Sequence, residues 1–125
     1  MPKCNFYALC RYVDKTDGSA KCGYLPKEGY DVPNDLGIKL SVYKSVEQDI
    51  CCLDKTVWHV TDVESGLEVG KGDTKKDAIH NAIKSLSMVG KERLEAQRRK
   101  IREQYGEMPG YRISWLHGKD LRDLI

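Results

Sequence analysis

Four residues in the middle of the chain have side chains that could act as general acids or bases: His59, Asp62, Glu64 and His80. Such groups catalyse reactions when they are held beside a nucleophile or a bound water. The sequence has no G-x-S-x-G segment, no cysteine in a known nucleophile motif and no paired-carboxylate motif. On an extended strand, His59 falls on the face opposite Trp58 and Val60, which predicts a solvated imidazole. We therefore expect a protein that is not an enzyme and that carries no cofactor.

The cysteines are the next residues that could carry chemistry. There are 5 of them, at Cys4, Cys10, Cys22, Cys51 and Cys52. Adjacent cysteines cannot easily bridge each other, and the C-x2-C spacing of many zinc sites is missing. The N-terminus also lacks the apolar segment of a signal peptide. We expect reduced thiols in a cytoplasmic protein without a bound metal.

Positive charge collects in the C-terminal part of the chain. Residues 1–70 hold 8 Lys and Arg against 11 Asp and Glu, whereas residues 71–125 hold 13 against 8. The densest basic group consists of Arg93, Arg98, Arg99, Lys100 and Arg102. On a helix, Arg98 follows Glu95 at ion-pair spacing, which would lower the free charge. Two interpretations remain open: a solvated, ion-paired helix, or a basic surface that binds nucleic acid.

Aromatic residues near this basic group extend the candidate surface. Tyr105 follows Leu94 and Ile101 at coiled-coil spacing, and Trp115 lies in an apolar tail over residues 111–116. Such side chains are usually buried against the protein itself or against a partner. We expect self-association through Leu94, Ile101 and Tyr105. We also expect a partner-binding surface that comprises Arg93, Arg98, Arg99, Lys100, Arg102, Tyr105 and Trp115.

Strands are the first elements that must position these residues. Residues 5–13 are rich in aromatic and apolar types, an Asp-Gly turn follows, and residues 20–25 could return as a second strand. Residues 26–37 contain two prolines and two glycines, and we interpret them as a surface loop. Alternating apolar and polar residues then predict strands at 38–46, 57–63 and 67–70, which form a three-stranded antiparallel meander.

The pattern changes to a helical period near Asp73. The glycines of 66–72 do not fit the phosphate-loop motif, and we attribute them to hairpin and helix-entry geometry. Either Thr74 or Asp73 can cap a helix that begins here. The apolar stripe of this helix would comprise Ala78, Ile79, Ala82, Ile83, Leu86 and Val89. An unbroken helix over 74–105 would be about 48 Å long and would protrude from a small domain, so we favour a break or kink at Gly90. Gly106 ends the helical pattern.

A family resemblance covers residues 38–87. The segment Gly72-Asp73-Thr74-Lys75-Lys76-Asp77-Ala78, followed by Asn81-Ala82 and Leu86, resembles the strand-to-helix junction of HicB-type antitoxins. The β-β-β-α order before it is similar to that family's partial ribonuclease-H-like module. The resemblance implies a non-catalytic sheet-and-helix module that works by binding another macromolecule.

Together these patterns predict one α+β domain over residues 1–125. An antiparallel sheet of four or five strands is packed on one face by a long amphipathic helix, followed by a charged second helical segment and a short C-terminal tail. The parts are an N-terminal hairpin and loop (1–36), the β-β-β-α module (37–89), and the charged helix and tail (90–125). The expected core comprises Phe6, Leu9, Ile38, Leu40, Val42, Trp58, Val60, Leu67, Val69, Ile79, Ile83 and Leu86.

The absence of chemical motifs and the overlong helix favour a binding role. We expect a small cytoplasmic protein that neutralises or regulates a protein partner, as an antitoxin or mobile-element inhibitor does, in phage or plasmid defence. We also expect a homodimer. No apolar run reaches the roughly 18 residues of a membrane span, so we expect no membrane partner. The alternative is nucleic-acid binding through the basic helix 91–105.

Overall fold

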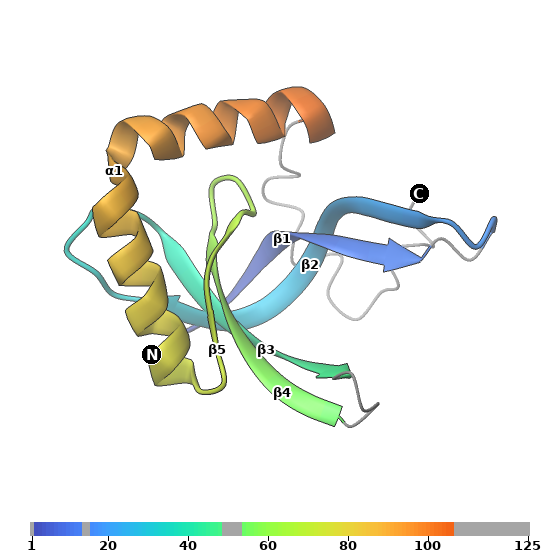
Figure 1. Cartoon of the computed structure of the whole chain (residues 1–125), viewed down its shortest axis with the longest axis horizontal. Coiled ribbons are helices and arrows are strands. Elements are labelled where there is room, and N and C mark those ends of the chain that lie inside the picture. The colour runs from blue at the N-terminus through green and yellow to red at the C-terminus, as the bar shows by residue number, and fades with distance from the viewer. Residues whose placement is uncertain (1, 14–15, 49–53, 107–125) are drawn as a thin grey trace.

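The computed structural model describes residues 2–13, 16–48 and 54–106 of the 125-residue chain. These ranges contain a five-stranded antiparallel sheet in the order β1-β2-β3-β4-β5 and one long helix (Figure 1). The elements are β1 (Lys3–Val13), β2 (Ala20–Val32), β3 (Leu40–Gln48), β4 (Asp54–Asp62), β5 (Glu68–Gly72) and α1 (Lys75–Tyr105). The predicted α+β fold and the meander are confirmed, while the predicted C-terminal tail lies outside the described residues. No described helix is long and apolar enough to cross a membrane.

The prediction of a surface loop over residues 26–37 is wrong for its first part, because β2 continues to Val32. Pro26 pairs opposite Tyr7 of β1, whereas β2 pairs with β3 only from Tyr30 to Val32. The edge of β2 that faces away from β1 is therefore not paired with β3 at Pro26. A proline is tolerated at such an edge, because its missing N–H group removes no ladder hydrogen bond there.

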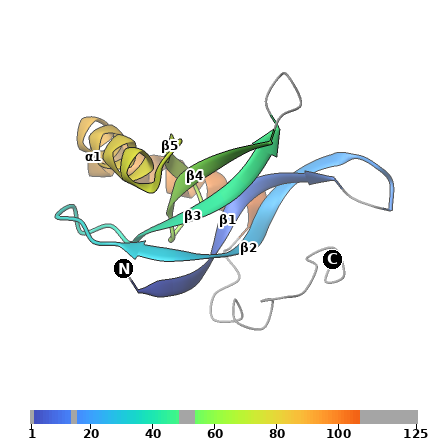
Figure 2. The same cartoon turned by 90° about the horizontal axis from the view of Figure 1, so that it is seen from below.

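The sheet buries apolar side chains on both of its faces. α1 covers one face, where the buried core comprises Val32, Leu40, Val42, Val60, Ala78, Ala82, Leu86 and Leu94. On the other face, residues of β1 pack on β3 in a second cluster of Phe6, Ala8 and Tyr43. Figure 2 shows α1 and the β1–β2 hairpin on opposite sides of β3 and β4. β3 and β4 thus lie between α1 on one side and the β1–β2 hairpin on the other (Figure 2).

Most of the predicted core lies in these clusters. Phe6, Leu40, Val42, Val60 and Leu86 are buried. A second group is partly buried and packs against the helix-side core: Ile38, Trp58, Val69, Ile79 and Ile83. Leu9 and Leu67 are also only partly buried. The period-two and period-3.6 patterns therefore located the helix-side core correctly.

The first half of α1 lies very close to β5. Its start is capped as predicted, since Thr74 Oγ1 accepts a hydrogen bond from the Asp77 N–H at 3.1 Å. Ala78 and Ala82 have no exposed surface, and a Cβ added at Gly70 would lie 2.5 Å from the Cβ of Ala82. The absence of side chains at Gly70, and likewise at Gly72, is what permits this approach. Of the two causes that we expected for these glycines, hairpin geometry explains Gly66 with its φ of 78°.

α1 bends at Gly90, where the backbone is not helical (φ 80°, ψ 164°). Figure 1 shows the first half running along β5 and the second half turning across the end of the sheet. The favoured break or kink at Gly90 is confirmed, and the charged residues 91–105 form the second half of α1. Gly106 ends α1 with a φ of 81°, and its N–H donates to the Arg102 carbonyl at 2.9 Å.

Candidate binding surfaces

Arg98 anchors the second half of α1 and is only 8% exposed. Its Nε donates to Asp62 Oδ2 at 2.8 Å, and its Nη2 donates to Asp62 Oδ1 at 2.9 Å, which is a bidentate pair. Asp62 ends β4 and has no exposed surface. Ser65 Oγ donates a further hydrogen bond to Asp62 Oδ2 at 2.7 Å. This buried network joins the helix to the end of the sheet.

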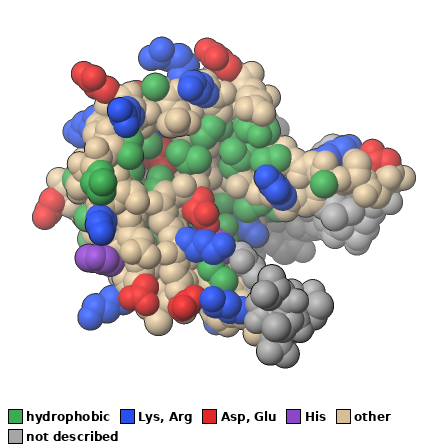
Figure 3. Space-filling view, in the orientation of Figure 1, with side chains coloured by type: hydrophobic (Ala, Val, Ile, Leu, Met, Phe, Trp, Pro, Cys, Tyr) green, Lys and Arg blue, Asp and Glu red, His purple; other side chains and the backbone are tan. Residues whose placement is uncertain are grey.

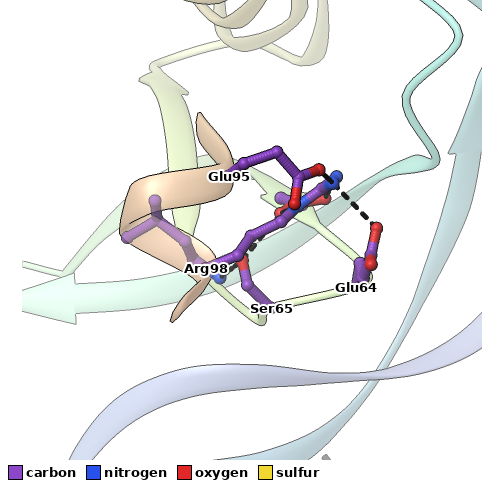
Figure 4. A network of polar contacts seen from close by, with 6 residues as sticks. Glu64, Ser65, Glu95 and Arg98 are labelled. Carbon is purple, nitrogen blue, oxygen red and sulfur yellow. Dashed lines mark hydrogen bonds and ion pairs between the residues drawn. The ribbon is translucent and has the colours of Figure 1, made fainter. Parts of the chain in front are cut away.

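Two exposed carboxylates complete the surroundings of Arg98. Its Nη1 lies 2.8 Å from Glu64 Oε2 and 2.6 Å from Glu95 Oε1, so the predicted Glu95–Arg98 pair is confirmed (Figure 4). Hydrogen bonding to Asp62 is the largest effect that raises the pKa of Arg98, and burial opposes it. Because its guanidinium group is enclosed by three carboxylates of its own chain, we remove Arg98 from the candidate partner-binding residues.

The other predicted partner-binding residues do not form one surface. Of these residues, Arg93, Arg99, Lys100 and Arg102 are exposed on the second half of α1. Figure 3 shows lysine and arginine side chains along this half of the helix and hydrophobic side chains gathered below it. Tyr105 instead packs edge-on against Tyr24 of β2, with ring centroids 6.5 Å apart. Trp115 lies outside the described residues.

The expected self-contact seam is used inside the protein. Leu94 is 4% exposed and Ile101 is 7% exposed, so neither side chain is available to a second copy. The bend at Gly90 turns these side chains onto the sheet, whereas a straight helix would have held them away from it. A homodimer would therefore need a different surface.

The inside of the bend forms an open hollow of about 590 Å³, which we call the bend groove. Its apolar lining includes Leu67, Val69, Leu86, Val89 and Leu94. The side chains of Arg93 and Lys100 also line it, together with Glu68 of β5. Val89 remains 41% exposed although it belongs to the apolar stripe of α1. The groove depends on the change of direction at Gly90, so a helical periodicity that assumes a straight helix could not locate it.

The prediction that His59 is solvated is wrong, because this imidazole is only 6% exposed. The sequence correctly placed His59 on the face of the sheet that does not carry the helix-side core. That face is covered as well, by the cluster of Phe6, Ala8 and Tyr43. The His59 ring stacks on Tyr43 with centroids 4.9 Å apart. Its Nε2 lies 2.6 Å from Ser45 Oγ, and its Nδ1 contacts the carboxylate of Glu68.

The four acid–base residues singled out in the sequence do not share one site. His59 belongs to a Ser45–His59–Glu68 hydrogen-bond chain that joins β3, β4 and β5. Asp62 and Glu64 instead face Arg98, and His80 is exposed on α1. A hydroxyl, an imidazole and a carboxylate in this order also occur in serine-nucleophile sites. In this protein, however, Ser45 and His59 do not line the bend groove. Their hydrogen-bond chain with Glu68 instead connects three strands of the sheet.

Three cysteines lie within the described ranges: Cys4, Cys10 and Cys22, all with free thiols. Cys4 Sγ lies 2.9 Å from Ser41 Oγ, and burial is the main cause that raises the pKa of its thiol. Cys10 Sγ lies 3.8 Å from the hydroxyl of Tyr43. The thiols of Cys4 and Cys10 thus help to connect β1 to β3.

The fold and its surfaces define an α+β protein in which a bent helix covers one face of a five-stranded sheet. Comparisons with protein-family models, with curated proteins and with solved structures found no match to this chain. Its function is therefore argued from the surfaces described above.

Proposed function

We propose that this chain is a small non-enzymatic binding protein that neutralises or regulates a protein partner, as an antitoxin or a mobile-element inhibitor does. The observation that carries the proposal is the bend groove, an open hollow of about 590 Å³ with an apolar lining. Concave apolar surface that stays exposed is typical of sites where proteins bind one another. A cytoplasmic role in phage or plasmid defence belongs to the same proposal.

The composition of the bend groove suits a protein partner. Protein interfaces combine an apolar centre with a polar rim, and a few anchoring side chains supply most of the binding energy. Val89 and Leu94 belong to the apolar part, and Arg93 and Lys100 supply positive charge beside it. The Asp62–Arg98 pair already holds the second half of α1 in place. Binding would therefore need little ordering of this surface.

The alternative of nucleic-acid binding through helix 91–105 has less support. Arg98 lies in the middle of the basic stretch, and its side chain turns inward to Asp62. Its Nη1 also faces Glu64 and Glu95, whose carboxylates lie beside the remaining basic residues. Fewer cations are thus available to phosphates than the sequence suggested.

Purification of the tagged full chain from its native host tests the proposal. Val89→Asp places a charge in the bend groove, whereas Met88→Asp places one at a neighbouring residue that is 77% exposed and does not line the groove. We expect one protein to co-purify in stoichiometric amount with the wild type and with Met88→Asp, and to be lost with Val89→Asp. Circular dichroism would check that both variants fold. Equal retention by both variants, or no stoichiometric partner at all, would contradict the proposal.

A further inference from the structure

A second surface, at the start of α1, supports an inference beyond protein binding. Lys44 of β3 pairs directly opposite Trp58 of β4, and Tyr30 of β2 pairs opposite Val42 of β3. Because Val42 and Lys44 are two positions apart on the same strand, these side chains share one face of the sheet. α1 begins beside them with Lys75. We call this group the lysine–aromatic site.

The lysine ammonium groups of this site lie over its aromatic rings. Lys75 Nζ is 4.5 Å from the ring centroid of Tyr30 and 5.6 Å from that of Trp58. Lys44 Nζ is 5.8 Å from the ring centroid of Trp58. Both rings are only partly buried, and they pack against the helix-side core. The rings are thus held in place while part of their surface remains accessible.

Tyr30, Lys44 and Trp58 of this site, but not Lys75, line a hollow of about 310 Å³ between diverging strands. β2 and β3 pair over only three residue pairs, from Tyr30–Val42 to Val32–Leu40, and Figure 1 shows the two hairpins separating beyond that point. Lys3 lines the hollow together with Tyr30, Lys44 and Trp58. Glu28 is the single carboxylate among the described residues that line it. The hollow therefore combines aromatic surface with a local excess of positive charge.

We propose that the lysine–aromatic site binds single-stranded nucleic acid. Proteins bind single strands by stacking the bases on aromatic rings and by placing cationic side chains along the phosphates. Tyr30 and Trp58 would supply the stacking, and lysines 3, 44 and 75 would pair with phosphates. A duplex suits the site less well, because its bases already stack on one another. The site shares no residue with the bend groove or with the basic half of α1.

The first test is an anisotropy titration of the full chain with a labelled oligothymidylate of about ten nucleotides, starting at about 50 mM salt. Three phosphate contacts predict that log K falls with log salt with a slope of about −2. We expect Lys44→Ala/Lys75→Ala to weaken binding at least about tenfold. The matched control Arg99→Ala/Lys100→Ala also removes two positive charges and should change affinity less than about threefold. The reverse pattern would assign binding to the basic half of α1 and overturn the proposal, as would undetectable binding.

The second test monitors the unaltered site through tryptophan fluorescence. Trp115→Phe leaves Trp58 as the only tryptophan of the chain. Stacking of a base on Trp58 should quench its emission as the oligothymidylate is added, with the same midpoint as the anisotropy titration. Binding without quenching would contradict the stacking arrangement. Equally tight binding of a duplex, or of an oligoglutamate peptide of the same length, would show a nonspecific anion site and overturn the proposal.

Discussion

The two halves of α1 are attached to the same sheet by different forces. The first half is placed by shape, because Ala78 and Ala82 lie against the bare backbone of Gly70. The second half is placed by charge, through the buried pair of Arg98 and Asp62. Close packing depends on the volume of each side chain, whereas a buried ion pair depends on both charges being present. The first half should therefore be sensitive to added atoms, and the second half to a lost charge.

The largest effect is expected when one charge of the buried pair is removed. Asp62→Leu leaves the guanidinium of Arg98 without its main partner, which typically lowers the free energy of unfolding by about 3–5 kcal/mol. Glu64 and Glu95 still face Arg98, so we expect the lower end of this range. Urea unfolding of the variant and the wild type measures the loss.

The double variant Asp62→Leu/Arg98→Met is the control for that prediction. Replacing both partners of a buried pair by apolar residues is often neutral, because no uncompensated charge remains. We expect the double variant to recover most of the stability lost by Asp62→Leu. A double variant as unstable as the single one would mean that the pair does not dominate the anchoring of the second half.

A smaller effect is expected when one methyl group is added beneath the first half. In Gly70→Ala the new Cβ would lie 2.6 Å from the backbone nitrogen of Ala82, so the helix must shift. Overpacking of this kind costs about 1–3 kcal/mol. Gly23→Ala is the matched strand control, because its Cβ would meet only the Tyr12 side chain at ordinary contact distance, 3.5 Å. Thermal unfolding of the two variants should differ clearly, and equal melting temperatures would argue against close packing at Gly70.

The junction between the two halves should respond to backbone handedness. Gly90 has a φ of 80° and open space around it, so an added methyl group meets no neighbour. With its ψ of 164°, this backbone conformation is one that L-alanine disfavours by about 1–3 kcal/mol. D-alanine favours it, and a chain assembled by ligation with D-alanine at position 90 should be more stable by about 0.4–1 kcal/mol. If L-alanine and D-alanine changed the unfolding free energy alike, the bend would not be set by the backbone at this position.

The smallest effect is expected at the exposed carboxylates around Arg98. The side chains of Glu95 and Glu64 are 58% and 62% exposed, so water screens their attraction to the guanidinium. Glu95→Gln and Glu64→Gln should each lower the free energy of unfolding by less than about 1 kcal/mol. Chemical denaturation beside Asp62→Leu gives the comparison. A loss as large as that of Asp62→Leu would show that the network acts as one unit.

Local patterns predicted the elements that depend on neighbouring residues. The alternation of 38–46 indicated β3, and the hydroxyl of Thr74 indicated where α1 begins. Gly90 and Gly106 were assigned to the bend and to the helix end because a glycine interrupts a run of strong helix formers. The candidate surface was predicted only in part, since Arg93 and Lys100 do line the bend groove whereas Arg98 does not face solvent.

The sequence by itself determined the antiparallel meander of residues 38–70, the apolar stripe of the helix and the position of its bend, because each depends on residues a few positions apart. Only the tertiary structure decided the burial of His59 and Arg98. Periodicity assigns a side chain to a face, but whether that face is covered depends on segments far along the chain. Arg98 finds its carboxylate 36 residues away, and an ion buried at this depth is stable only when folding brings that partner to it.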